Sequence, residues 1–195
     1  MSNARDIIAT PSRRLFLGNA GKATLSVAAI ALLAGKGNMA FAAAGKEEQD
    51  VSILNVALGL EHEGINAYTL GAQSGLLQKP VLDIAVKFQS DHKAHRDALI
   101  ATIEKMGGKP VAEKKLDEYA KALKADTLKS QNDVLELASR LELGATNAYL
   151  GVIPSFKDAS LAKVAARLAA DETMHWTILN NALGRPLAAA FSFGA

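Results

Sequence analysis

Two stretches decide the fold: residues 91–99, DHKAHRDAL, and residues 171–179, DETMHWTIL. Each contains an Asp, a residue that can bind a metal, two further residues and then a His. Residues three apart in an α-helix lie on one face, so each stretch can direct two metal-binding side chains toward one point. The chain has four histidines, and three of them lie in these two stretches.

A second pair of stretches is also repeated. Residues 60–68, LEHEGINAY, align with residues 141–149, LELGATNAY, at an offset of 81, and the Asp-containing stretches align at an offset of 80. Each member of the new pair has a Glu followed seven residues later by a Tyr, close to the same helix face. The sequence therefore predicts two similar helical hairpins related by a pseudo-twofold axis.

Four long segments carry apolar residues at steps of three and four, which is typical of amphipathic helices. Helix-ending signals place their C-terminal ends near Gly71–Gly75, Gly107, Pro154 and Gly184. The second helix is expected to begin near Pro80, which suits a first helical turn. No segment alternates convincingly as a strand does, so the predicted fold class is all-α.

The link between the second and third helices, about residues 108–128, is longer than the other two links. Its segment 113–124 is expected to form a short helix on the solvated surface. A long link lets the second and third helices run parallel, which is the topology of a four-helix bundle with one long crossover.

Ionisable residues interrupt the apolar stripe near the middle of all four long helices. A carboxylate in an apolar core is costly unless it is paired or bound to a metal. The chain has no cysteine, which excludes disulfides and thiolate metal sites, and oxygen with imidazole ligands suits Fe, Mn or Zn. The interrupting residues are Glu61, His92, His95, Glu142, Glu172 and His175. His62 and Glu63 point away from this stripe and are expected on a solvated or interface face.

The pattern resembles the ferritin-like superfamily of di-iron carboxylate bundles, over about residues 50–184. Those bundles hold two metals with one Glu on each of two helices and Glu-x-x-His on the other two. The resemblance implies Fe as the metal, two ions per chain, with Mn or Zn as alternatives. The ligands that it implies are Glu61, Glu142, Glu172, His95 and His175. His92 stands where the family usually has a Glu that bridges the metals, so an asymmetric centre, or one with a single well-bound metal, is also open.

The resemblance also implies partners for the ligands. Tyr68 and Tyr149 are expected to hydrogen-bond ligand carboxylates, with a role as core aromatics as the alternative. Asp91 is expected to accept from His175, and Asp171 from His95, which would fix the tautomer of each metal-binding imidazole.

Residues 1–42 have the order of a cleaved export signal. Arg13 and Arg14 precede an apolar run of about residues 23–34 and then small residues, which resembles a twin-arginine signal. The run is shorter than the roughly 20 residues that span a bilayer, although an uncleaved anchor is the alternative. We expect a signal over 1–42 and one bundle domain over 43–195, with no stable membrane span after cleavage.

The composition is consistent with this division. The chain has 195 residues, 49% of them hydrophobic, which suits one globular domain. Without residues 1–42, 17 of the 22 basic residues and 19 of the 20 acidic residues remain, a net charge of −2. No basic patch supports nucleic-acid binding.

The expected function is that of an exported, periplasmic protein, a monomer or homodimer, that oxidises Fe(II) with O2 or peroxide for iron handling or oxidant defence. The alternative is a periplasmic structural or binding module that holds a single structural metal, or none, without redox turnover. A ferritin-type storage cage is a third possibility, which the short middle link and the export signal disfavour.

Overall fold

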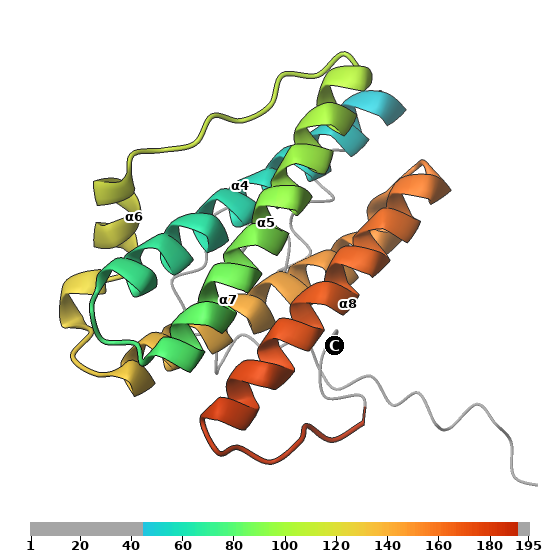
Figure 1. Cartoon of the computed structure of the whole chain (residues 1–195). Helices are drawn as coiled ribbons and strands as arrows, with labels where there is room; N and C mark the ends of the chain where they lie inside the picture. The colour runs from blue at the N-terminus through green and yellow to red at the C-terminus, as the bar shows by residue number, and fades with distance from the viewer. Residues whose placement is uncertain (1–44, 191–195) are drawn as a thin grey trace, which may run out of the picture.

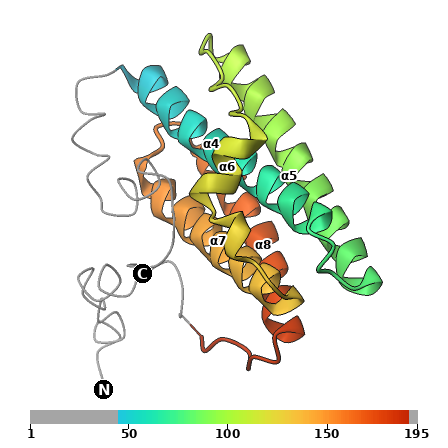
Figure 2. The same ribbon diagram turned by 90° about the vertical axis from the view of Figure 1, so that its left-hand side faces the viewer.

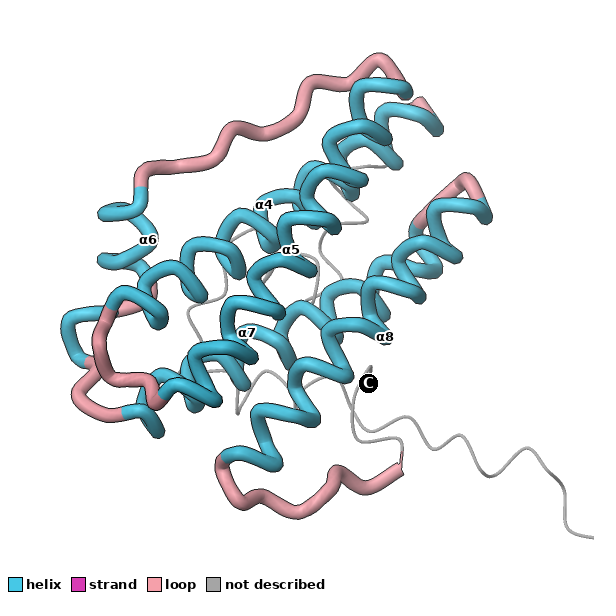
Figure 3. Tube along the Cα trace, in the orientation of Figure 1, coloured by secondary structure: helices cyan, strands magenta, loops and turns pink. Residues whose placement is uncertain are grey.

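The computed structural model describes residues 45–190, so the expected signal over 1–42 lies outside the described residues. Five α-helices and two short 3-10 helices occur in residues 45–190, and no strand does (Figure 3). The elements are α4 (Lys46–Gln73), α5 (Lys79–Lys105), α6 (Leu116–Ala122), η1 (Ala125–Thr127), α7 (Gln131–Val152), η2 (Ile153–Ser155) and α8 (Ala159–Ala182). The predicted all-α fold class is confirmed.

Local chemistry places the helix ends close to where the sequence predicts them. Pro80 lies in the first turn of α5, where its missing N–H costs no hydrogen bond. The Ser130 side chain accepts from the backbone N–H of Asp133 and caps α7, and the Asp158 carboxylate accepts from the N–H of Ser160 and caps α8. Gly75 has a φ of 71° in the turn between α4 and α5, a conformation that glycine adopts without strain.

The four long helices form two antiparallel hairpins, α4 with α5 and α7 with α8 (Figure 1). The chain leaves the end of α5 and returns along the bundle to the start of α7, so α5 and α7 run in the same direction (Figures 1 and 2). This is the predicted one-crossover topology.

The crossover is more closely packed than the sequence suggested. Figure 2 shows α6 lying across α4 and α7. Tyr119 and Leu123 are buried there with Leu137 of α7. The expectation of a solvated helix over 113–124 is therefore wrong for this apolar side of α6, which covers part of the α4–α7 surface.

Besides the cluster beneath α6, the apolar core has two clusters at opposite ends of the bundle. The larger joins the N-terminal halves of α4 and α8 to the C-terminal halves of α5 and α7. The smaller lies toward the other end and includes Tyr68, Phe88 and Leu135. Within residues 45–190, no helix is both long enough and apolar enough to cross a membrane.

Candidate metal centre

The six ionisable residues predicted as ligands come together in the middle of the bundle. They are among the most buried polar side chains: Glu172 is 0% exposed, Glu61 and Glu142 are 1% exposed, and His95, the most exposed of the six, is 9% exposed. Glu61 comes from α4, Glu142 from α7, His92 and His95 from α5, and Glu172 and His175 from α8.

The side chains form two overlapping groups, and in each group one ligand atom per residue lies within 4.8 Å of the others. The first group is Glu61, His92, His95 and Glu172, and the second is His92, Glu142, Glu172 and His175. His92 and Glu172 belong to both. Each group has carboxylate and imidazole donors suitable for Fe, Mn or Zn.

Several buried atoms of these groups have no hydrogen-bond partner. They are Nδ1 of His95, Nδ1 of His175, Oε2 of Glu142 and both carboxylate oxygens of Glu172. Nδ1 of His95 lies 3.1 Å from Oε1 of Glu172, and Nδ1 of His175 lies 3.3 Å from Oε2 of Glu172. Buried polar atoms in native proteins are nearly always satisfied, so donor atoms that converge without pairing fit a bound cation.

His92 has a different arrangement. Its Nδ1 lies 2.8 Å from Oε2 of Glu61, and its Nε2 lies 3.2 Å from Oε1 of Glu142. The ring also lies close to α4, where a Cβ added to Gly64 would approach the imidazole to 3.2 Å. His92 therefore lies between the two single Glu residues, with a carboxylate at each ring nitrogen.

Side chains from the opposite hairpin contact four of these six residues. The Tyr68 hydroxyl donates to Oε1 of Glu142, and the Tyr149 hydroxyl donates to Oε1 of Glu61. Nε2 of His95 lies 3.2 Å from Oδ2 of Asp171.

In the same way, Nε2 of His175 lies 3.4 Å from Oδ2 of Asp91. Both imidazoles thus turn Nδ1 inward and Nε2 toward an Asp. These are the pairings that the sequence led us to expect, whereas the metal-binding role of the residues remains a proposal.

A sequence profile described as a ferritin-like domain matches residues 49–185. The chain belongs to this ferritin-like family. The crystal structure of a conserved hypothetical protein from Mycobacterium tuberculosis is similar, with a TM-score of 0.59 and 26% sequence identity. The similarity covers 75% of this chain and 99% of that one. No curated protein shows significant similarity to the chain.

The electrostatics of this ferritin-like domain come from burial opposed by mutual pairing. Burial disfavours the charged forms, but His92 and His95 outweigh it and lower the pKa of Glu61 to about 2. Burial likewise opposes protonation of His95, yet Glu172 and Glu61 raise its pKa to about 10. For Glu172 burial prevails, and its pKa rises to about 7. The carboxylates and imidazoles thus lie close enough to shift one another's pKa, although Nδ1 of His95 and Nδ1 of His175 make no aligned hydrogen bond to Glu172.

The remaining ligands follow the same rule. Burial is outweighed by Glu142 and Glu172, which raise the pKa of His175 to about 9. The pKa of His92 is raised well above its usual value by Glu142 and Glu61 despite burial. The pKa of Glu142 is lowered well below its usual value, because the neighbouring imidazoles outweigh its burial.

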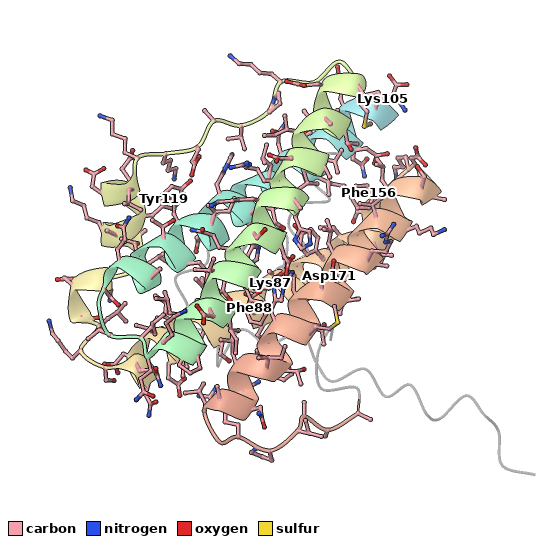
Figure 4. The ribbon with its side chains drawn as sticks, viewed as in Figure 1. Lys87, Phe88, Lys105, Tyr119, Phe156 and Asp171 are labelled. Carbon is pink, nitrogen blue, oxygen red and sulfur yellow. The ribbon has the colours of Figure 1, made fainter. Side chains whose placement is uncertain are left out.

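The ferritin-like centre has a polar approach between α5 and α8. Figure 4 shows Phe88 of α5 and Asp171 of α8 near the middle of the bundle. Phe88 stacks on the His175 ring with the ring centroids 4.0 Å apart. The side chains of Asp91 and Asp171 are 31% and 44% exposed. Both carboxylates are partly exposed and touch buried imidazoles, and the Asp91 carboxylate also pairs with Lys87 at the surface.

His62 and Glu63 differ from expectation. His62 is only 4% exposed, and its Nε2 lies 3.2 Å from the carbonyl oxygen of Val111 in the crossover. Burial raises the pKa of Glu63 to about 7, against the opposing effect of Lys114. The expectation of a solvated face is therefore wrong for both residues, because the link from α5 to α6 covers this side of α4. The alternative expectation, an interface face, is closer to the structure, although the segment that covers this face belongs to the same chain.

Proposed function

We propose that the chain binds iron in the centre between its two hairpins and oxidises Fe(II) with O2 or peroxide. Two Fe(II) ions give up two electrons, which with two protons reduce one O2 to hydrogen peroxide, or one hydrogen peroxide to two waters. In this reaction iron is a substrate, and Mn(II) or Zn(II) are alternative occupants of the same donor set.

The observation that carries the proposal is the set of converging atoms without partners. Nδ1 of His95, Nδ1 of His175 and the Glu172 carboxylate are buried, close together and not aligned for hydrogen bonds. One divalent cation in each of the two ligand groups would satisfy them. The family match supports the assignment, since proteins of this fold use such donor sets for iron.

The chain's own groups have separable roles in this proposal. Glu61 and Glu142 supply hard oxygen donors, which favour ferric over ferrous iron. The Tyr149 hydroxyl holds Oε1 of Glu61 and leaves Oε2 facing His92 and His95. The Tyr68 hydroxyl donates to Oε1 of Glu142, the oxygen that also faces His92 and His175. Asp91 and Asp171 orient the imidazoles of His175 and His95 and raise their basicity.

The decisive experiment measures metal content and turnover together. The purified protein is analysed for metals, stripped, reloaded anaerobically with Fe(II), and mixed with O2 or with peroxide. We expect about two irons per chain, as the resemblance to di-iron bundles implies. We also expect a ferric absorbance that rises as oxidant is consumed. A Glu172→Gln, His175→Gln double variant is the matched control. Iron that binds but is oxidised no faster than in buffer would refute the oxidase.

A second candidate is favoured by the arrangement of His92. Its two ring nitrogens already contact Glu61 and Glu142, which is how a protonated imidazole pairs with two carboxylates. The charge of the three carboxylates is balanced to zero by one divalent ion and one protonated His. Two divalent ions with three neutral His side chains would instead leave a buried positive charge. In this case the protein holds a single structural metal without redox turnover. About one tightly bound metal and no oxidant consumption would identify it.

Export is a separate part of the proposal and is supported by sequence alone. The pair Arg13–Arg14 ahead of a short apolar run fits the twin-arginine route, which would deliver a folded, metal-loaded domain to the periplasm. Fractionation of cells expressing the full chain tests this. We expect a shortened protein in the periplasm and retention of an Arg13→Lys, Arg14→Lys variant in the cytoplasm. Equal export of both would contradict the route.

A further inference from the structure

An apolar cavity reaches the metal centre from one end of the bundle. It is lined by the C-terminal half of α4, the N-terminal halves of α5 and α7, and the last turns of α8. These parts of the helices form the lower end of the bundle in Figure 1. Its volume is about 60 Å³. Tyr68, His92 and Glu142 form part of its wall, and apart from these and Glu63 the lining residues are apolar or glycine.

The internal repeat allows the end of the bundle that contains the cavity to be compared with the opposite end, position by position. At the 81- and 80-residue offsets of the two hairpins, Gly71 corresponds to Val152 and Val81 to Leu161. Val152 and Leu161 are buried in the larger core cluster at the opposite end, whereas Gly71 and Val81 line the cavity. At Val81 the cavity end thus has a smaller side chain than the filled end. At Gly71 the place of a side chain is taken by Val134, whose Cγ1 would lie 3.0 Å from an added Cβ.

We propose that this cavity is the route by which dioxygen, a small uncharged apolar molecule, reaches the face of the centre formed by Tyr68, His92 and Glu142. The proposal rests on the proposed Fe(II) oxidation and selects one of its two oxidants. It also gives the cation and the oxidant separate routes to the centre. Hydrated cations use the α5–α8 approach with its exposed Asp91 and Asp171, and the oxidant uses the apolar end.

The chemistry of the lining distinguishes dioxygen from peroxide. A water-sized molecule needs roughly 10–15 Å³ of such space, so the volume is sufficient for a few small molecules. Apolar cavities stay dry and accept apolar guests such as xenon. Hydrogen peroxide would lose its hydrogen bonds to water among Leu and Val side chains, and an uncompensated hydroxyl is costly to bury. Dioxygen has no such bonds to lose.

Two measurements test the route. The first uses xenon on the metal-free protein, by crystals under xenon pressure or by xenon NMR, and needs no turnover. The second mixes Fe(II)-loaded protein with O2 or with peroxide. The main variant is Ala138→Phe, which adds bulk to a half-buried cavity residue one helical turn before Glu142. Val81→Leu, which copies Leu161 of the other hairpin, is the milder variant, and Ala98→Phe on the exposed side of α5 is the control.

We expect xenon in the cavity of the parent and of Ala98→Phe but not of Ala138→Phe. Oxidation by O2 should slow by about tenfold or more in Ala138→Phe, as when access limits the rate, and less in Val81→Leu. Oxidation by peroxide should be unchanged. Absence of xenon from the parent, or equal slowing with both oxidants, would overturn the route. A variant that excludes xenon but oxidises Fe(II) with O2 at the parent rate would overturn the route and leave the proposed function standing. Failure of the parent to oxidise Fe(II) with either oxidant would remove the proposed function as well.

Discussion

Replacing His92 with Glu would give the centre the second Glu-x-x-His that ferritin-like bundles usually carry. The His92 ring contacts Glu61 at 2.8 Å and Glu142 at 3.2 Å. The three side chains are 5%, 2% and 2% exposed. The substitution therefore removes the partner of two buried carboxylates and adds a third carboxylate among them.

The cost of this change follows from the burial. Removing one partner of a buried ion pair destabilises a protein by about 3–5 kcal/mol. Because two contacts are lost, we expect the free energy of unfolding of the metal-free variant to fall by at least about 3 kcal/mol, from a total that is about 5–15 kcal/mol for such domains. A divalent metal should offset most of this loss, since the added carboxylate becomes a ligand. Metal at a hundredfold excess over its Kd contributes about 2.7 kcal/mol.

Urea unfolding with and without Mn(II), followed by circular dichroism, measures both quantities. His62→Gln is the matched control, because His62 is equally buried on α4 but contacts the crossover, and it should destabilise both forms alike. A metal-free His92→Glu protein within about 1 kcal/mol of the parent, the effect of an ordinary substitution, would refute the reasoning. So would a variant that metal stabilises no more than it stabilises the parent.

Three further outcomes are expected. Asp171→Asn should weaken metal binding about 10–100-fold by titration calorimetry, whereas Asp97→Asn on the exposed side of α5 should not, and equal affinities would remove the orienting role. The pKa of His95 rises from 6.5 to about 10 on folding, so its contribution to metal-free stability is complete below pH 6.5 and is lost as the pH rises toward 10. Because a metal must displace this proton from His95, the affinity for Mn(II) should increase over the same pH range. Melting temperatures measured with and without Mn(II) that change equally with pH would contradict this coupling between the proton and the metal. Val81→Leu should raise the free energy of unfolding by up to about 0.8 kcal/mol, because the added methylene fills part of the cavity. Leu161→Val at the packed end should lower it by about 0.5–1.5 kcal/mol. A destabilised Val81→Leu variant in urea unfolding would show that the cavity has no room for the larger side chain.

The spacing of the ionisable residues explains why so much could be predicted. A Glu or His placed three residues from a His on an apolar helix face has few neighbours other than the core, and the repeat fixed which helices were equivalent. The contacts of Asp171 with His95 and of Tyr68 with a ligand carboxylate were expected from the resemblance to ferritin-like bundles.

The features that the sequence did not reveal depend on contacts between distant segments. His62 is buried because the crossover passes over it, and a crossover's path leaves no periodic signal in the chain. The cavity is lined by residues of four helices and includes Val81, the smaller counterpart of Leu161, and these residues come together only when the two hairpins pack. The aligned repeat contained this signal, in the positions where the two halves disagree.

The cross-hairpin contacts also have a consequence for folding kinetics. Each hairpin is local in sequence and should form quickly, but Tyr68–Glu142, Tyr149–Glu61 and both Asp–His pairs arise only when one hairpin docks on the other. Metal should therefore leave the formation of each hairpin unchanged and slow only their separation. In native-state hydrogen exchange, the amides of all four long helices near the centre should then gain protection together, as one cooperative unit.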